Sequence, residues 1–295
     1  MSDPKSNYRL LDFGMGRKLE QFGELIVDRP CPAATSPQKD LSLWDQADLS
    51  YGLKAEDRWH YIDSRKMQTG TAIANWFCVC DGIRLFLKPT PAGQVGVFPE
   101  HWGHWPWLLK KLVLSETLND VSPRVLSLFA YTGATTLALA RAGCALTHVD
   151  SSKPTVAWAR KNCANSSLGS ASIRWIVDDA ASFLKRELRR KMQYDAILLD
   201  PPTYGHGAKG TRWEIQRHLV PLLNDCWQLL SSERRAVLLL CGHSSHIAIR
   251  VINETLAQQH GAESVSNCEI RQANLVDSFG RKLDCGFAAR YSFSG

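Results

Sequence analysis

The stretch "YDAILLDPPTYG", residues 194–205, joins an apolar run to a carboxylate, two prolines and an aromatic ring. The apolar run before Asp200 is typical of a central strand that is buried on both faces of a sheet. Prolines cannot donate to a sheet ladder, so we expect the strand to end before Pro201 and Pro202. The sequence thus places a carboxylate, two rigid carbonyls and the Tyr204 ring at the carboxyl end of one strand, where they could contact a ligand.

A second chemically suggestive stretch is "LFAYTGATTLALARAG", residues 128–143, which predicts a strand, a tight turn and a helix. Gly133 would let the backbone approach a ligand closely. Thr135 and Thr136 stand near the helix start, where hydroxyls can cap exposed amides. A dinucleotide fold would need G-x-G-x-x-G here, so the single glycine argues against a pyrophosphate ligand.

Acidic residues end three successive predicted strands: Asp150, Asp179 and Asp200. An acid at the position of Asp150 can accept hydrogen bonds from both hydroxyls of a ribose. Asp179 is placed to meet an adenine amino group. Three acids around a one-glycine turn suit a cationic cofactor that carries an adenosine. S-adenosylmethionine fits, because carboxylates attract its sulfonium.

The elements that must position these residues alternate strictly from Pro123 onward. Such alternation predicts an α/β fold in which helices cover both faces of a parallel sheet, with ligands outside the carboxyl ends of the strands. One of the helices is expected to span 212–230. Seven strands are expected, at 124–130, 146–150, 173–179, 194–199, 235–242, 263–273 and 285–294.

The preceding part of the chain lacks this alternation, and we expect a small β-rich N-terminal region at 1–92 and a second domain at 93–295. "NWFCVCDGIRLFLKPT", residues 75–90, predicts a hairpin that turns at Asp81 and Gly82. The tryptophan-rich stretch 101–112 predicts a helix.

The composition is that of a globular protein, with 44% hydrophobic and 22% charged residues among 295. A formal charge of +6 permits a nucleic-acid partner without requiring one. The nine cysteines are scattered without a CxxC pair, which argues against zinc and favours free thiols in a reducing cytosol. No signal peptide and no apolar run of about 18 residues is present, so we expect a cytoplasmic protein without a membrane span.

Taken together, "LFAYTGATTLALARAG", "HVDSSKPTVAWARKN", "DDAASFL" and "YDAILLDPPTYG" resemble the class I S-adenosylmethionine-dependent methyltransferases. Within that class the chain resembles the bacterial 23S ribosomal RNA methyltransferases that modify C5 of cytosine or N7 of guanine. The resemblance runs from about residue 93 to 295 and includes "GQVGVFPEHW". In the resembled enzymes a Phe and polar neighbours of this motif contact the cofactor, so the same is expected here. It implies a Rossmann-like methyltransferase fold and an RNA substrate, with ribosomal RNA as the expected class.

The resemblance also implies roles for individual residues. Asp200 and the carbonyls of Pro201 and Pro202 would hold the acceptor base, and Tyr204 would stack on it. The cofactor-binding residues would be Phe98, Phe129, Tyr131, Thr132, Gly133, Thr135, Asp150, Ser151, Ser152, Asp179, Ala180 and Asp200.

The residues after the fifth predicted strand bear on the acceptor atom. Enzymes that methylate C5 of cytosine use a cysteine thiolate, because C5 is not itself nucleophilic. By our alignment His243 occupies the place of that cysteine, and Cys241 lies two residues deeper on the same strand. An acceptor with its own lone pair, such as guanine N7 or an exocyclic amine, is therefore favoured. His243 would contact the substrate or, alternatively, cap the following helix as a surface residue.

Three further features were weighed. His243 and His246 have a metal-like spacing, but methyl transfer needs no metal and no third ligand is evident in the sequence, so we expect none. "KRELRRK", residues 185–191, is typical of a solvated helix face, with phosphate contact as the alternative. Lys209 and Arg212, in the glycine-rich stretch after Tyr204, are better candidates for phosphate contact.

Two other functions stay open at the level of the sequence. The chain could instead transfer the methyl group of the same cofactor to a small molecule or to a protein. Alternatively, the chain could be a catalytically silent assembly factor that binds the cofactor or RNA.

Overall fold

The computed structural model describes residues 5–52, 58–62, 75–113, 121–206, 212–232, 236–243, 249–261 and 263–293. The chain divides into two compact units. The first unit comprises Met1–Gly103, Ala164–Ser167 and Ala273–Cys285, and the second comprises His104–Cys163, Leu168–Gln272 and Gly286–Gly295. The first unit extends beyond residue 92. The division into two domains between residues 92 and 93 therefore stays a prediction.

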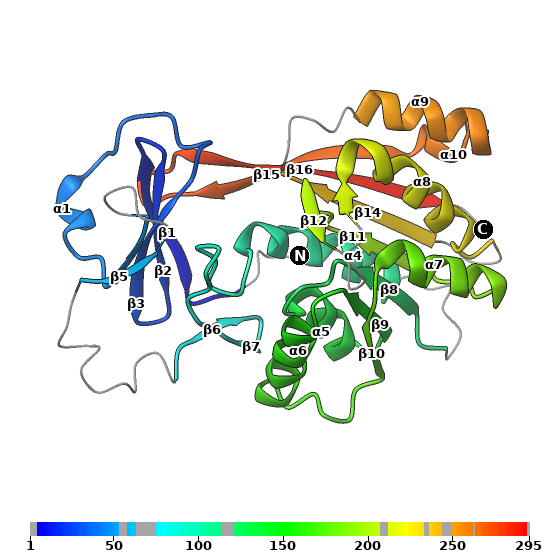
Figure 1. Ribbon diagram of the computed structural model, residues 1–295, viewed down its shortest axis with the longest axis horizontal. Coiled ribbons are helices and arrows are strands. Elements are labelled where there is room, and N and C mark those ends of the chain that lie inside the picture. The colour runs from blue at the N-terminus through cyan, green and yellow to red at the C-terminus, as the bar shows by residue number, and fades with distance from the viewer. Residues whose placement is uncertain are drawn as a thin grey trace. The chain divides into compact units, whose positions relative to one another are not determined.

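A seven-stranded sheet forms the centre of the second unit (Figure 1). The first five strands in its order run parallel, and β16 pairs with β14 in the antiparallel direction. This arrangement confirms the predicted mostly parallel sheet. The strand order is β10 (Ile173–Val177), β9 (Ala145–Asp150), β8 (Arg124–Leu128), β11 (Ala196–Leu199), β14 (Ala236–Gly242), β16 (Lys282–Phe293) and β15 (Cys268–Val276).

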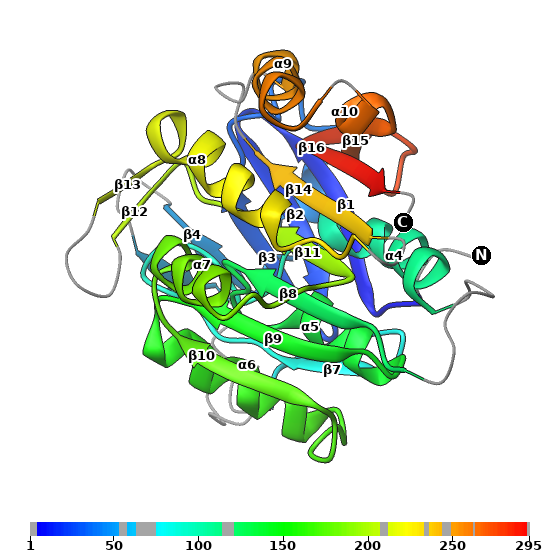
Figure 2. The same cartoon turned by 90° about the vertical axis from the view of Figure 1, so that its right-hand side faces the viewer.

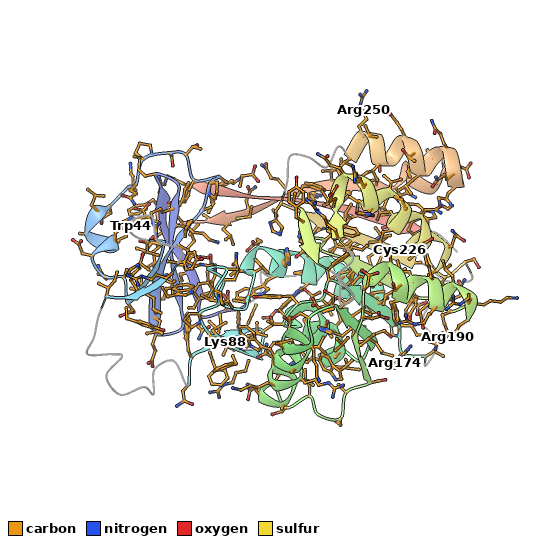
Figure 3. All side chains as sticks on the ribbon, viewed as in Figure 1. Trp44, Lys88, Arg174, Arg190, Cys226 and Arg250 are labelled. Atoms are coloured by element: carbon orange, nitrogen blue, oxygen red, sulfur yellow. The ribbon has the colours of Figure 1, made fainter. Side chains whose placement is uncertain are left out.

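Helices cover both faces of this sheet (Figure 2). Leu126 packs in one core cluster with side chains of α7 (Ala180–Arg189), α8 (Ile215–Gln228) and α9 (Ile249–His260). Cys226, labelled in Figure 3, belongs to the same cluster. Val125 points to the other face, where it packs with α4 (Trp105–Leu112) and α5 (Ala134–Arg141). The alternation along β8 therefore builds two cores from one strand.

The strand order places two loops next to each other. β8 and β11 are neighbours, although two strands and their helices separate them in the sequence. The order of the strands reverses here, which makes this the topological switch point where open α/β sheets bind ligands. The loops after β8 and β11 are those that the sequence analysis selected.

Several predicted element boundaries are wrong; β8 ends at Leu128 rather than at 130, β15 continues to Val276 rather than to 273, and β16 begins at Lys282 rather than at 285. Residues 212–214 form β13 (Arg212–Glu214), which pairs with β12 (Tyr204–His206), so α8 begins at Ile215 rather than at 212. Residues 263–266 form the short helix α10 (Glu263–Ser266), in which the Ser266 hydroxyl donates to the Glu263 carbonyl. β15 therefore begins at Cys268. The start of α8 shifted because a strand pairing across a loop took up 212–214, and the start of β15 shifted because 263–266 form a helical turn.

The first unit contains a five-stranded sheet, which confirms the predicted β-rich N-terminal region. In the hairpin of β6 (Phe77–Cys80) and β7 (Ile83–Phe86), Asp81 and Gly82 have φ angles of 45° and 76°, as the predicted tight turn requires. A 3-10 helix follows at Pro99–His104. The sheet strands are β1 (Tyr8–Gly14), β2 (Arg17–Phe22), β3 (Leu25–Pro30), β4 (Leu49–Tyr51) and β5 (Trp59–Tyr61), and α1 (Leu41–Trp44) lies between β3 and β4.

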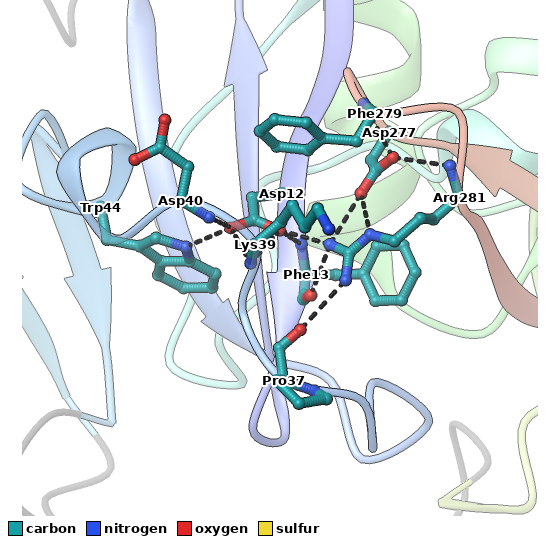
Figure 4. A network of polar contacts seen from close by, with 9 residues as sticks. All are labelled: Asp12, Phe13, Pro37, Lys39, Asp40, Trp44, Asp277, Phe279 and Arg281. Atoms are coloured by element: carbon teal, nitrogen blue, oxygen red, sulfur yellow. Dashed lines mark hydrogen bonds and ion pairs between the residues drawn. The ribbon is translucent and has the colours of Figure 1, made fainter.

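Arg281 joins the segment 273–285 to this sheet (Figure 4). Its guanidinium group pairs with the carboxylates of Asp12 and Asp277 and donates to the carbonyl of Phe13. Trp44 Nε1 donates to Asp12 Oδ2 at 2.9 Å. Burial alone would raise the pKa of Asp12, but these hydrogen bonds and those from backbone amides lower it. The buried carboxylate of Asp12 is thus held ionised at the centre of the network.

Membrane insertion through a helix finds no support in the described part of the chain. None of its helices is both long enough and apolar enough to cross a bilayer.

Candidate active site

The loop between β8 and α5 has an unusual backbone. Phe129, Tyr131 and Gly133 have φ angles of 52°, 49° and 86°, all in the left-handed region. Residues with a side chain rarely adopt this conformation, and such strain persists where surrounding contacts enforce it, often at functional sites. A Cβ atom on Gly133 would also lie only 3.2 Å from the Cβ of Ala159. Gly133 is therefore needed both for its φ angle and for the close approach of α6 (Lys153–Asn165).

Asp150 connects this loop to the end of β9. Its Oδ2 accepts a hydrogen bond from the Tyr131 amide, and its Oδ1 accepts one from the Ser152 amide, both at 2.9 Å. Burial raises the pKa of Asp150, and the two amides counteract only part of that effect. Each carboxylate oxygen can accept more than one hydrogen bond, so Asp150 keeps acceptor capacity for the ribose hydroxyls that the sequence analysis assigned to it.

The threonines of the loop serve different partners from those expected. The helix α5 begins at Ala134, and its N-cap residue Gly133 provides no side-chain cap. Thr135 Oγ1 instead accepts from Trp105 Nε1 at 3.1 Å. The carbonyl of Thr132 accepts from Asn162 Nδ2 at 3.0 Å. The proposed capping role of the hydroxyls is therefore wrong, because neighbouring helices use these groups to fix the loop.

The residues after β9 and β10 start the next helices. Ser152 Oγ accepts from the amide of Thr155 at 3.3 Å in the first turn of α6, and Ser151 lies between it and Asp150. Asp179 caps α7, with its Oδ1 accepting from the Ser182 amide at 2.9 Å. The buried Ala180 follows as the first residue of that helix. One oxygen of Asp179 is thus engaged, and its contact with an adenine stays a prediction.

The motif "DPPTYG" ends β11 and begins a hairpin that extends from the sheet (Figure 2). Tyr204 is the first residue of β12, and 67% of its side chain is exposed, as a stacking platform requires. The Pro202 carbonyl accepts a hydrogen bond from Trp213 Nε1 at 2.6 Å. That carbonyl therefore also fixes the hairpin, which the sequence did not reveal. Trp213 packs in turn on Phe129, with ring centroids 5.1 Å apart.

His243 lies against Asp200 at the adjoining strand ends. β14 and β11 are parallel neighbours, and His243 Nε2 is 3.5 Å from Asp200 Oδ1. Both side chains are partly exposed, at 40% and 26%. Cys241 belongs to β14 and is buried, in agreement with its predicted deeper position. The structure thus brings together the acid and the histidine that the sequence placed in one site.

Two arginine side chains pair with Glu214, the last residue of the β12–β13 hairpin. Arg212 Nε and Arg217 Nε pair with the two oxygens of Glu214, at 3.1 and 3.3 Å. Both arginines are more than 70% exposed, and ion pairs at such positions are weak. Arg212 can therefore exchange its partner for a phosphate. Lys209 lies outside the described residues.

The basic stretch 185–191 contains an arginine that forms an ion pair within its own helix. Arg174 and Arg190, labelled in Figure 3, pair with the buried carboxylate of Glu187 at 3.7 and 2.9 Å. At least part of this positive charge is used within the second unit, which favours the solvated helix face over a phosphate site.

Phe98 belongs to the first unit, where its ring lies beside that of His101 at a centroid distance of 5.8 Å. Its contact with the cofactor stays a prediction.

Comparison with known proteins places this site in a family. The chain is 30% identical to a crystallised S-adenosylmethionine-dependent methyltransferase from Agrobacterium tumefaciens, with a TM-score of 0.84 over 98% of this chain and 91% of that one. The chain belongs to the class I S-adenosylmethionine-dependent methyltransferases. Among family models, "Conserved hypothetical protein 95" matches residues 113–221 of this methyltransferase.

Curated relatives of this methyltransferase are much longer. It is 29% identical over 181 residues to ribosomal RNA large subunit methyltransferase K/L of Shewanella sp. strain MR-4, which covers 60% of this chain and 23% of the relative. The enzyme of the same name from Shewanella oneidensis is 29% identical over 213 residues, or 72% of this chain and 27% of the relative. The chain therefore spans about a quarter of the length of these relatives.

Proposed function

We propose that the second unit binds S-adenosylmethionine and transfers its methyl group to a base nitrogen of RNA, with ribosomal RNA as the expected substrate. The observation that carries this proposal is the grouping of the strained 129–133 loop, Asp150 and Asp200 at the carboxyl ends of adjacent strands. The family to which the chain belongs supports the cofactor. The names of the Shewanella relatives support RNA as the substrate.

The residues present fit this cofactor. Gly133 permits the left-handed turn of the loop, and Asp150 and Asp200 supply negative charge for a cationic ligand. Asp150 would accept from the ribose hydroxyls while the Tyr131 amide holds its carboxylate in place. When bound, S-adenosylmethionine supplies a methyl group on a positively charged sulfonium. The loop residues then have the task of orienting that group, since in-line displacement depends mainly on positioning.

The hairpin would hold the acceptor. Asp200 and the Pro201 carbonyl would accept hydrogen bonds from the base, and the exposed ring of Tyr204 would stack on it. The Pro202 carbonyl, bound to Trp213, would add one further acceptor through its second lone pair. Arg212 and Lys209 would contact phosphates beside the base.

A nitrogen acceptor is supported by the pair of His243 and Asp200. The histidine stands where a C5 methyltransferase would need its cysteine, and the nearest thiol, Cys241, is buried. A nitrogen with its own lone pair needs no covalent attack at C6. His243 would contact the base beside Asp200. We further propose that the reaction takes place in the cytoplasm and uses no metal ion.

Mass spectrometry of methylated nucleosides in RNA from a deletion strain tests this function. We expect one base-methylated nucleoside to disappear from ribosomal RNA and to return with the wild-type protein but not with Asp200→Ala. An unchanged set of nucleosides in all RNA would contradict an RNA substrate. Loss of 5-methylcytidine would contradict the nitrogen acceptor but would leave the RNA substrate and the cofactor in place.

A further inference from the structure

His148 is a buried polar residue on β9, two residues before Asp150. Its side chain is fully buried, and residues two apart on a strand point to the same face. Leu146, two residues earlier again, packs there in an apolar cluster with α5. The surroundings favour an aliphatic side chain at 148, so the imidazole requires a separate explanation.

The imidazole contacts the carboxyl end of the loop after β8. Its Nδ1 lies 3.0 Å from Thr136 Oγ1, in the first turn of α5. Its Cε1 lies 3.6 Å from the position that a Cβ atom on Gly133 would occupy. His148 therefore lies directly beneath the turn.

Two residues on the same face of β9 thus support the turn. Asp150 receives the Tyr131 amide hydrogen, whereas His148 contacts Thr136 and lies below Gly133. The left-handed residues of the loop lie between these contacts, and such a conformation persists only where neighbours enforce it.

The remaining ring nitrogen argues against a purely structural role. The Nε2 atom is buried, and none of the described residues gives it a hydrogen-bond partner. A leucine would avoid that cost, because a buried polar atom without a partner destabilises the folded state. Burial also lowers the pKa of His148 to about 3, which keeps the ring neutral near neutral pH.

We propose that His148 is a positioning residue that fixes the 129–133 loop and the Asp150 carboxylate in the geometry that receives the cofactor. This inference rests on the proposed function. It assigns to His148 no contact with the cofactor or the acceptor base.

Three variants and two measurements test this role. His148→Leu removes the hydrogen bond with Thr136, whereas His148→Asn keeps an amide group where Nδ1 stands. Leu146→Ala is the matched control, since it removes core packing on the same strand face without touching the loop. The first measurement is amide hydrogen exchange at Tyr131 in the protein without cofactor, and the second is the affinity for S-adenosylmethionine by calorimetry.

We expect His148→Leu to accelerate exchange at Tyr131 and to weaken cofactor binding, each by about 3- to 10-fold, the usual effect of losing a neutral hydrogen bond. His148→Asn should lie close to the wild type in both measurements. Leu146→Ala should lower the melting temperature and change neither. Exchange at Tyr131 that is as slow in His148→Leu as in the wild type would overturn the positioning role. A wild-type protein that binds no cofactor would instead overturn the proposed function and, with it, the purpose of the positioning.

Discussion

His243 and Asp200 face each other across two adjacent strand ends, with Nε2 of the histidine 3.5 Å from Oδ1 of the acid. Both residues follow paired strands: Leu199 pairs with Leu240, Asp200 comes directly after β11, and His243 comes directly after β14. A histidine beside Asp200, with a buried thiol two residues earlier, is the arrangement on which we base the proposal of a nitrogen acceptor rather than C5 of cytosine.

Cys241→Ala should therefore keep measurable turnover, because a nitrogen acceptor needs no covalent adduct. His243→Ala, the comparison variant in the proposed substrate contact, should lose more activity. Turnover of both variants can be measured with RNA that carries the acceptor. A covalent complex between the wild type and RNA containing 5-fluorocytosine, absent in Cys241→Ala, would restore the C5 mechanism.

Substitutions at different residues of "DPPTYG" should impair different steps of the reaction. Asp200→Ala should lose rate with its melting temperature nearly unchanged. Tyr204→Phe should be mild, since the ring face remains, whereas Tyr204→Ala should cost about 1–3 kcal/mol of substrate binding. Single-turnover rates and melting temperatures of the three variants check this order. Full activity in a folded Tyr204→Ala would mean that the motif only ends a strand.

Stability should depend on pH through His148. Its pKa is lowered by burial to about 3, from the ordinary value of 6.5. A histidine whose folded pKa is depressed binds its proton more readily in the unfolded chain. Its contribution to stability is thus complete above pH 6.5 and is lost as the pH falls toward 3, by about 1.4 kcal/mol for each pH unit.

His148→Asn carries no titrating ring at this position and should show a flatter loss of stability between these limits. Urea unfolding at several pH values measures the slope. Equal slopes in His148→Asn and the wild type would show that His148 titrates at its ordinary pKa.

Arg281→Met should destabilise the first unit, because it leaves the buried Asp12 carboxylate without its cationic partner. Breaking a buried ion pair from one side costs about 3–5 kcal/mol, and the remaining bonds from Trp44 and the backbone should keep the loss near the lower end. Lys39→Met is the control, since only the backbone amide of Lys39 bonds to Asp12. If both variants unfold at the same denaturant concentration, the network of Figure 4 adds little to the stability of the first unit.

Local patterns were sufficient for much of the fold. The alternation of strands and helices after Pro123 and the turn at Asp81 and Gly82 depend on neighbours in the sequence, and the structure confirms both. The start of α8 was mispredicted because the pairing of Gly205 with Trp213 converts 212–214 into a strand. That pairing joins residues on either side of a loop and leaves no local signal.

The candidate site was also predicted only where the signal is local in the sequence. Gly133 marked the loop after β8 in the sequence, since its residue type alone permits the turn. The strain at Tyr131 could not be foreseen, because contacts from β9 enforce it. Trp213 was missed for a similar reason: its bond to the Pro202 carbonyl depends on the hairpin. The link between Arg281 and Asp12 joins residues from opposite ends of the chain and has no signature in either segment.

Calorimetric titration with S-adenosylmethionine, of the wild type and of Asp150→Ala, tests the central claim most directly. Each hydrogen bond from a ribose hydroxyl to the carboxylate is worth about 1.5–3 kcal/mol, so the variant should bind about 10- to 150-fold more weakly or worse. Asp178→Asn is the control, since that acid pairs with Arg186 at the end of β10. We expect it to bind as the wild type does. Equal affinity in Asp150→Ala and the wild type would contradict the placement of the cofactor at the end of β9, and a wild type that binds no S-adenosylmethionine would contradict the account as a whole.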